Sequence, residues 1–173
     1  MIIDVLSLLF IIFLGFIGFR RGTAFSVLHK GTTMVALFIA KSYYLPIAER
    51  LELFLPYPKT QAYDITFAIS FNHLETRFYH IIAFIVIASL AKLIFYAIIV
   101  TFDNLILAHK LSKMSRGIGV IVSIFAASIY LVPLLYITSL YPNAWIQSQL
   151  TSSIIAKQLI TQLPILSQFV VNI

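Results

Sequence analysis

The chain contains no cysteine and little charge: only 10% of its 173 residues are charged, against about 25% in a typical soluble domain. The lack of cysteine excludes disulfides, thiolate metal sites and cysteine nucleophiles. Six acidic residues and four histidines are present, and none cluster within the long apolar segments as a metal site or an acid/base pair requires. His73 and His80 lie near Glu75 in the sequence, a set that is more often surface than ligand. Phosphate-loop, zinc-helix and nucleophile-elbow motifs are also missing. We therefore expect no enzyme and no catalytic, cofactor or metal site.

Apolar residues make up most of the chain. They account for 61% of the sequence, and the mean hydropathy is +1.00. Such a surface needs lipid as its solvent, so we expect the lipid bilayer as a partner. The net charge of +6 could indicate nucleic acid. However, the basic residues are scattered between apolar runs, which predicts no nucleic-acid partner and makes the basic charge a signal of membrane topology.

Four segments have about the 20 apolar residues that a helix needs to cross the roughly 30 Å hydrocarbon core. They are residues 2–19, 23–45, 80–102 and 118–140. The sequence thus predicts an all-α, polytopic helical bundle over residues 1–143. The second segment carries His29, Lys30 and Lys41, whereas the fourth carries no charge.

Lysine and arginine in short loops tend to stay cytoplasmic. The first connection has Arg20 and Arg21, and the third has Lys110, Lys113 and Arg116. Acidic and basic residues balance in the longer middle loop, residues 46–79. We therefore expect both termini outside, in a protein that crosses the membrane four times.

Three segments outside the spans have recognisable patterns. Residues 47–55 resemble a short amphipathic helix, and the alternation over residues 65–71 predicts a strand or an interfacial segment. The tail, residues 144–173, carries apolar residues at i, i+4 spacing up to Leu163, which predicts an amphipathic helix on the outer surface, ended by Pro164. Whether this tail is interfacial or inserted stays open.

Lys92 lies within the third predicted span, about 18 Å deep if the helix starts near His80. An intramembrane lysine costs a few kcal/mol. It therefore either faces a polar cavity or a carboxylate, or extends its stem toward an interface. Lys30 could belong to the same polar site or anchor the second span at the interface. Asp4 could pair with a cation or lie in the headgroup region.

Small residues recur at helical spacing in the first and fourth spans. They are Gly15, Gly18 and Gly22 in one span, and Gly119, Ser123 and Ala127 in the other. Small residues let helix backbones approach closely in a membrane. We expect close packing of these two spans, either within the bundle or between protomers.

Taken in order, several of these residues resemble the pattern of the colicin V production protein (CvpA) family of bacterial inner-membrane proteins. The matching positions are an early Asp4, the pair Arg21–Gly22 that ends the first helix, a late Ala40 in the second, and Arg116 with Gly119 opening the last helix. Three positions depart from the pattern: Ser115 replaces an Asp that often precedes the arginine, Ser123 replaces the second glycine, and Ala126–Ala127 replaces a further Arg–Gly pair.

The resemblance implies a small multi-pass inner-membrane protein of a family named for colicin V production, with no catalytic residues. Our first hypothesis is a non-enzymatic protein that supports toxin production, export or envelope homeostasis by self-association or by docking to other membrane proteins. The alternative is an oligomeric channel or transporter subunit with Lys92 and Lys30 lining a polar route. A membrane enzyme would need polar residues brought together by the outer loop.

Overall fold

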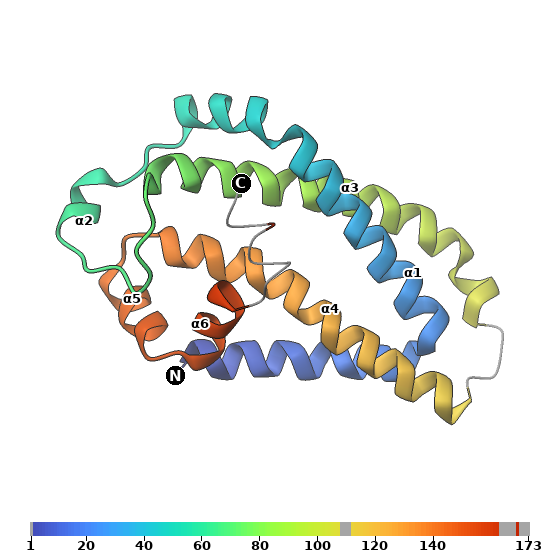
Figure 1. Ribbon diagram of the computed structural model, residues 1–173. Coiled ribbons are helices and arrows are strands. Elements are labelled where there is room, and N and C mark those ends of the chain that lie inside the picture. Colours follow the sequence, from blue (N-terminus) through green and yellow to red (C-terminus); the bar gives the residue numbers. More distant parts are fainter. Residues whose placement is uncertain (1, 108–111, 163–168, 170–173) are drawn as a thin grey trace.

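The structure, a computed structural model, describes residues 2–107, 112–162 and 169 (Figure 1). These residues contain six helices. In order they are α1 (Ile2–Phe54), α2 (Lys59–Tyr63), α3 (Leu74–Leu107), α4 (Lys113–Leu140), α5 (Ala144–Thr151) and α6 (Ile154–Thr161). No strand occurs among the described residues. The prediction of an all-α fold is confirmed.

Helix α1 turns sharply at Gly22, whose φ of 74° and ψ of −173° are not helical. A side chain disfavours this backbone conformation, and glycine adopts it without strain. We call residues 2–21 the first arm of α1 and residues 23–54 its second arm. The predicted spans 2–19 and 23–45 fall in these two arms, joined by a single turning residue instead of a loop.

Helices α1, α3 and α4 are long and apolar enough to cross a membrane. Because α1 turns at Gly22, each of its arms has the roughly 20 residues that one crossing requires. Helix α3 begins at Leu74, one and a half turns before the expected start near residue 80, and α4 begins at Lys113 instead of near residue 118.

The connections gather at the two ends of the bundle. Gly22 and Ser115 lie at one end, which we call the Gly22 end, and Asp4, α2 and α5 lie at the other, the Asp4 end (Figure 1). Helix α1 makes most of the contacts, packing on both α3 and α4, while α3 and α4 touch each other much less. This arrangement leaves α1 to close the space between α3 and α4.

The segments between the long helices differ from expectation in two places. Residues 47–54 do not form a separate amphipathic helix but continue α1 through Pro46. The alternating segment, residues 65–71, is not a strand: it runs irregularly between α2 and α3. Here the Ala68 amide donates to the Gln147 side chain at 3.0 Å, so a side chain takes the place that a neighbouring strand would fill.

The predicted tail helix is divided into α5 and α6. The Ser153 hydroxyl accepts a hydrogen bond from the Ala156 amide at 3.0 Å and so caps a new helix start, a role in which serine is strongly favoured. Leu150, Ala156 and Ile160 are buried in the core, so these two helices pack on the bundle. Pro164 lies outside the described residues.

Candidate functional site

The first arm of α1 crosses α4 with almost no space between the backbones. A Cβ added to Gly119 would lie 2.5 Å from the Gly18 carbonyl oxygen and 2.8 Å from the Gly22 carbonyl carbon. A Cβ added to Gly18 would overlap the Gly119 carbonyl oxygen and lie 2.5 Å from Ser123 Oγ. The small faces of these two helices thus face each other within one chain.

The rest of the two small-residue faces follows the same crossing. Gly15 lies beneath α4, where an added Cβ would meet Ile124 at 3.4 Å and Val120 at 3.8 Å. Ser123 and Ala127 are almost fully buried.

The turn at Gly22 is fixed from α4. The Ser115 hydroxyl accepts a hydrogen bond from the Thr23 amide at 3.1 Å, and the Thr23 hydroxyl donates to the Ser115 carbonyl at 2.9 Å. Ser115 therefore caps the second arm of α1 from outside that helix, as a cap residue does at a helix N-terminus. Arg21 stacks on Phe25 at 4.1 Å, so its charge stays at the Gly22 end.

Arg116, the other arginine of the family pattern, is exposed and has its guanidinium 5.5 Å from the ring centre of Phe19. It thus joins the start of α4 to the end of the first arm of α1. The contact is a cation–π pair at an exposed position, typically about 0.5–1 kcal/mol.

Lys92 reaches from α3 to the second arm of α1. Its ammonium donates to the His29 carbonyl at 2.5 Å and to the Thr32 hydroxyl at 2.8 Å. No carboxylate pairs with it among the described residues. The lysine is thus held by neutral acceptors in the middle of the bundle, which is costly inside a membrane unless further polar groups solvate the charge.

Lys30 approaches the same region from α1. Its ammonium lies 5.0 Å from the ring centre of Tyr130 on α4, and the Tyr130 hydroxyl shares a 2.7 Å hydrogen bond with Thr33. Lys92 donates to the carbonyl of His29, the residue beside Lys30, so the two lysines approach the same part of α1. That Lys30 belongs to this polar site stays a prediction.

Two cavities have Tyr130 in their walls. The larger, about 230 Å³, lies between α1, α3 and α4 and has Thr33, Ser89 and Lys92 in its otherwise mostly apolar wall. The smaller, about 130 Å³, is lined by both Lys30 and Arg21. Together they contain three cations, and no acidic side chain lines either cavity among the described residues. Such a site can attract an anion.

Asp4 ties the start of α1 to the tail. Its carboxylate accepts hydrogen bonds from the Ser153 hydroxyl at 2.7 Å and the Ile155 amide at 3.0 Å. The acid thus binds the N-terminus of α6, where unsatisfied amides favour a negative charge.

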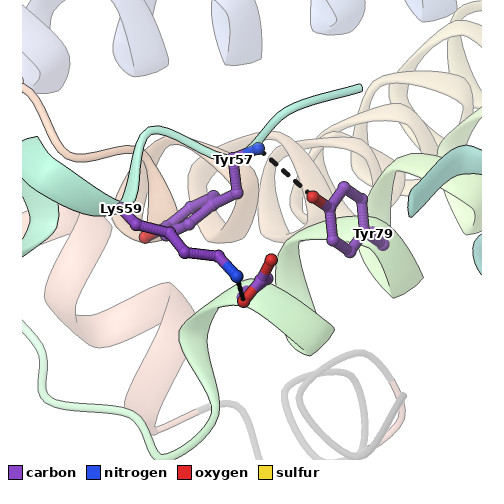
Figure 2. Close-up of polar contacts among 4 residues, drawn as sticks. Tyr57, Lys59 and Tyr79 are labelled. Atoms are coloured by element: carbon purple, nitrogen blue, oxygen red, sulfur yellow. Dashed lines mark hydrogen bonds and ion pairs between the residues drawn. The ribbon is translucent and has the colours of Figure 1, made fainter. Parts of the chain in front are cut away.

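The Asp4 end also carries a polar contact among α2, α3 and the segment before α2 (Figure 2). The Lys59 ammonium pairs with Glu75 at 2.9 Å, and this hydrogen bond and charge raise the pKa of Lys59. The Tyr57 amide donates to the Tyr79 hydroxyl at 3.2 Å. Because Lys59 is exposed and its charge is neutralised by Glu75, we interpret this contact as a fastening of the loop to α3.

The described residues contain no group of three or more histidine, aspartate or glutamate side chains that could hold a metal ion. The expectation that the chain has no catalytic site stays a prediction. The anion-attracting cavities therefore form the candidate functional site.

Sequence reasoning missed three residues of these sites: Thr33, Tyr130 and Ser115. Tyr130 gave one signal, since it is a hydroxyl-bearing residue in the middle of the charge-free fourth span. Its partner Thr33 lies 97 positions away, and no local spacing reveals such a pairing.

Comparison with known proteins agrees with the membrane architecture. The chain is 24% identical over 166 residues to the uncharacterized transmembrane protein YshB of Bacillus subtilis (strain 168), an alignment that covers 95% of this chain and 93% of that protein. No solved structure matches. The family model described as "Colicin V production protein" matches residues 3–164. The chain is therefore a membrane protein that belongs to the colicin V production protein family.

Proposed function

We propose that this protein is a non-enzymatic membrane subunit that binds an anion between its helices. Through that binding it supports toxin production, export or envelope homeostasis. The observation that carries the proposal is the convergence of Lys30 and Lys92 on one inter-helix space, with no carboxylate beside either lysine among the described residues. Buried or membrane-embedded cations are normally paired or serve a function.

The hydrogen bonding of Lys92 favours a ligand. An ammonium has three donors, and the described residues accept two of them, at His29 and Thr32. One donor is left for a further acceptor. An anion at that position would also offset the repulsion between Lys92 and Lys30, which the neutral groups around them do only in part.

Assembly through the glycine faces is less well supported than binding. Gly18 and Gly119 already contact each other within one chain, so a second copy cannot use the same close approach. Self-association, or docking to other membrane proteins, would need the exposed apolar faces of α1 and α3. Affinity purification after crosslinking in native membranes tests for such partners.

We place the Gly22 end in the cytoplasm and both termini outside the bacterial inner membrane. The Gly22 end carries Arg20, Arg21, Lys113 and Arg116, a concentration of cations that is typical of cytoplasmic connections. Lys110, which completes the expected cluster, lies outside the described residues. The notion that the tail, residues 144–173, lies at the interface and does not insert into the membrane stays a prediction.

Anion binding can be measured by ligand-dependent stability. Inorganic phosphate or acetate is titrated into the purified protein, and the unfolding midpoint is followed by the fluorescence of Trp145. A ligand at ten times its Kd stabilises the folded state by about 1.4 kcal/mol, so the midpoint should rise. Lys92→Gln and Lys30→Gln should each reduce the rise, whereas a change at the exposed α6 residue Lys157, Lys157→Gln, should not. No rise with any anion, or an equal rise in all variants, refutes the proposal.

Conduction is a separate question from binding. If the site is part of a route, liposomes that contain the protein should release a trapped anion faster than empty liposomes, and Lys92→Leu should abolish the difference. Binding without flux would identify a binding subunit, and flux that Lys92→Leu leaves unchanged would place the route elsewhere.

A further inference from the structure

The cavity beside Lys92 has one polar end and one apolar end. The polar groups come from Lys92, Thr33, Tyr130 and Ser89, which lies one turn before Lys92 on α3. Most of the remaining wall is aliphatic or aromatic and includes Phe84 and Leu134. A small hydrated anion in this space would lose water against surfaces that offer no hydrogen bonds.

The direction of each helix orients the cavity. Helix α3 runs toward the Gly22 end, so Phe84, eight residues before Lys92, lies about 12 Å closer to the Asp4 end. Helix α4 runs the other way, so Leu134, four residues after Tyr130, lies about 6 Å closer to the Asp4 end. The apolar part of the cavity therefore extends from the lysine toward the Asp4 end.

Cations lead to the polar end from the Gly22 end. Arg21 and Lys30 line the second cavity, which shares Tyr130 with the larger one. An anion that enters from the Gly22 end would meet Arg21 first, then Lys30, then Lys92. The order of the charges and the apolar extension together match an amphiphilic anion whose charged group faces the Gly22 end and whose chain faces the Asp4 end.

We propose that the larger cavity binds a single-chain fatty acid, with its carboxylate on Lys92 and its chain along Ala88 and Phe84 toward the Asp4 end. This inference rests on the proposed function and names its ligand. The carboxylate supplies the acceptor that Lys92 lacks, and the chain covers the wall that a free anion would leave bare. A phospholipid is disfavoured because the space lies between three helices and its second chain would have to stay outside.

Selectivity for this ligand arises at the carboxylate. Surrounding lipid is as apolar as the cavity wall, so moving a chain from the bilayer into the cavity changes little. The alkyl chain instead affects which anions reach Lys92, because it concentrates an amphiphilic carboxylate in the membrane. A neutral alcohol of equal length should therefore bind much more weakly than the acid.

Native mass spectrometry of the delipidated protein in a non-ionic detergent tests the proposal. Palmitate should bind with a stoichiometry of one, and hexadecanol at least tenfold more weakly. Lys92→Gln should weaken palmitate binding at least tenfold, whereas Lys157→Gln should leave it unchanged. Ala88→Leu places extra carbon in the apolar wall without changing any charge. It should weaken palmitate while leaving acetate binding intact.

A palmitate with a diazirine near the middle of its chain provides a second measurement on the wild-type protein, so the test does not depend on variant folding. Crosslinks should map to peptides that contain Phe84 or Leu134. Circular dichroism of each variant confirms that its helices are retained.

The outcomes separate this inference from the proposed function. If acetate or phosphate binds in a Lys92-dependent manner but palmitate binds no better than hexadecanol, the fatty-acid site is refuted and the anion site stands. Occupation by phosphatidylglycerol, but not by palmitate, also refutes it. If no anion of any kind binds, both proposals are refuted.

Discussion

Replacing Gly119 by alanine should destabilise the fold more than any other single-methyl change in α4. The added Cβ would lie 2.5 Å from the Gly18 carbonyl oxygen and 2.8 Å from the Gly22 carbonyl carbon. Both contacts are with backbone, which has no rotamer through which to move away. Overpacking of a tight interior costs about 1–3 kcal/mol, and we expect the upper part of this range. At about 1.4 kcal/mol per factor of ten, 3 kcal/mol raises the unfolded fraction about 100-fold.

Gly117 offers a matched control on the same helix, because a Cβ added there meets nothing within 4 Å. Alanine is favoured over glycine in a helix by up to about 1 kcal/mol, so Gly117→Ala should be neutral or stabilising. Unfolding of both variants in mixed micelles with increasing sodium dodecyl sulfate, followed by circular dichroism, gives the comparison. Equal stabilities of the Gly119→Ala and Gly117→Ala variants would refute the proposed backbone contact between α1 and α4.

Three further predictions concern the ends of the bundle. Asp4→Ala removes the acceptor for the α6 N-terminus and should lower the free energy of unfolding by about 1–2 kcal/mol. Hydrogen exchange at the Ile155 amide should become faster in this variant, and unchanged exchange would contradict the bond between Asp4 and α6. Asp4→Asn should lower the free energy of unfolding less. Burial and the charge of Glu75 raise the pKa of Tyr57, so its contribution to stability should persist below pH about 10 and be lost as the pH rises through the raised value. The 295 nm titration of the wild type minus that of Tyr57→Phe should show this late phenol, and a midpoint at or below 10 would argue against it. Because the chain has no cysteine, an impermeant maleimide applied to intact spheroplasts should label the Lys157→Cys variant but not the Lys113→Cys variant, and the reverse result would invert the topology.

The patterns that arise from local chemistry were readable in the sequence. Apolar runs long enough to cross a bilayer predicted a helical bundle, and the prediction is confirmed by α1, α3 and α4. Small residues at helical spacing predicted a close approach of the first and fourth spans, and Gly18 and Gly119 lie where that approach is closest. In both cases the sequence itself contains the cause, namely length in one and side-chain size in the other.

Features that depend on distant partners were not readable. A pair of arginines before Gly22 suggests a loop, yet the chain turns at one residue, and Ser115 caps the helix that follows by bonding to Thr23, 92 positions away. The alternating residues 65–71 have a strand pattern, but Gln147 takes up the Ala68 amide. Likewise, Lys92 could be recognised as unusual from its position alone, whereas its acceptors on α1, at positions 29 and 32, required the tertiary structure.

The bond between Asp4 and the start of α6 has a consequence for biogenesis. It joins residues 149 and 151 positions apart, so it cannot form until the ribosome has made almost the whole described chain. Until then the Asp4 carboxylate lacks both of these donors. Closure of this tie is therefore a late step of folding, and a chain interrupted before Ser153 cannot make it.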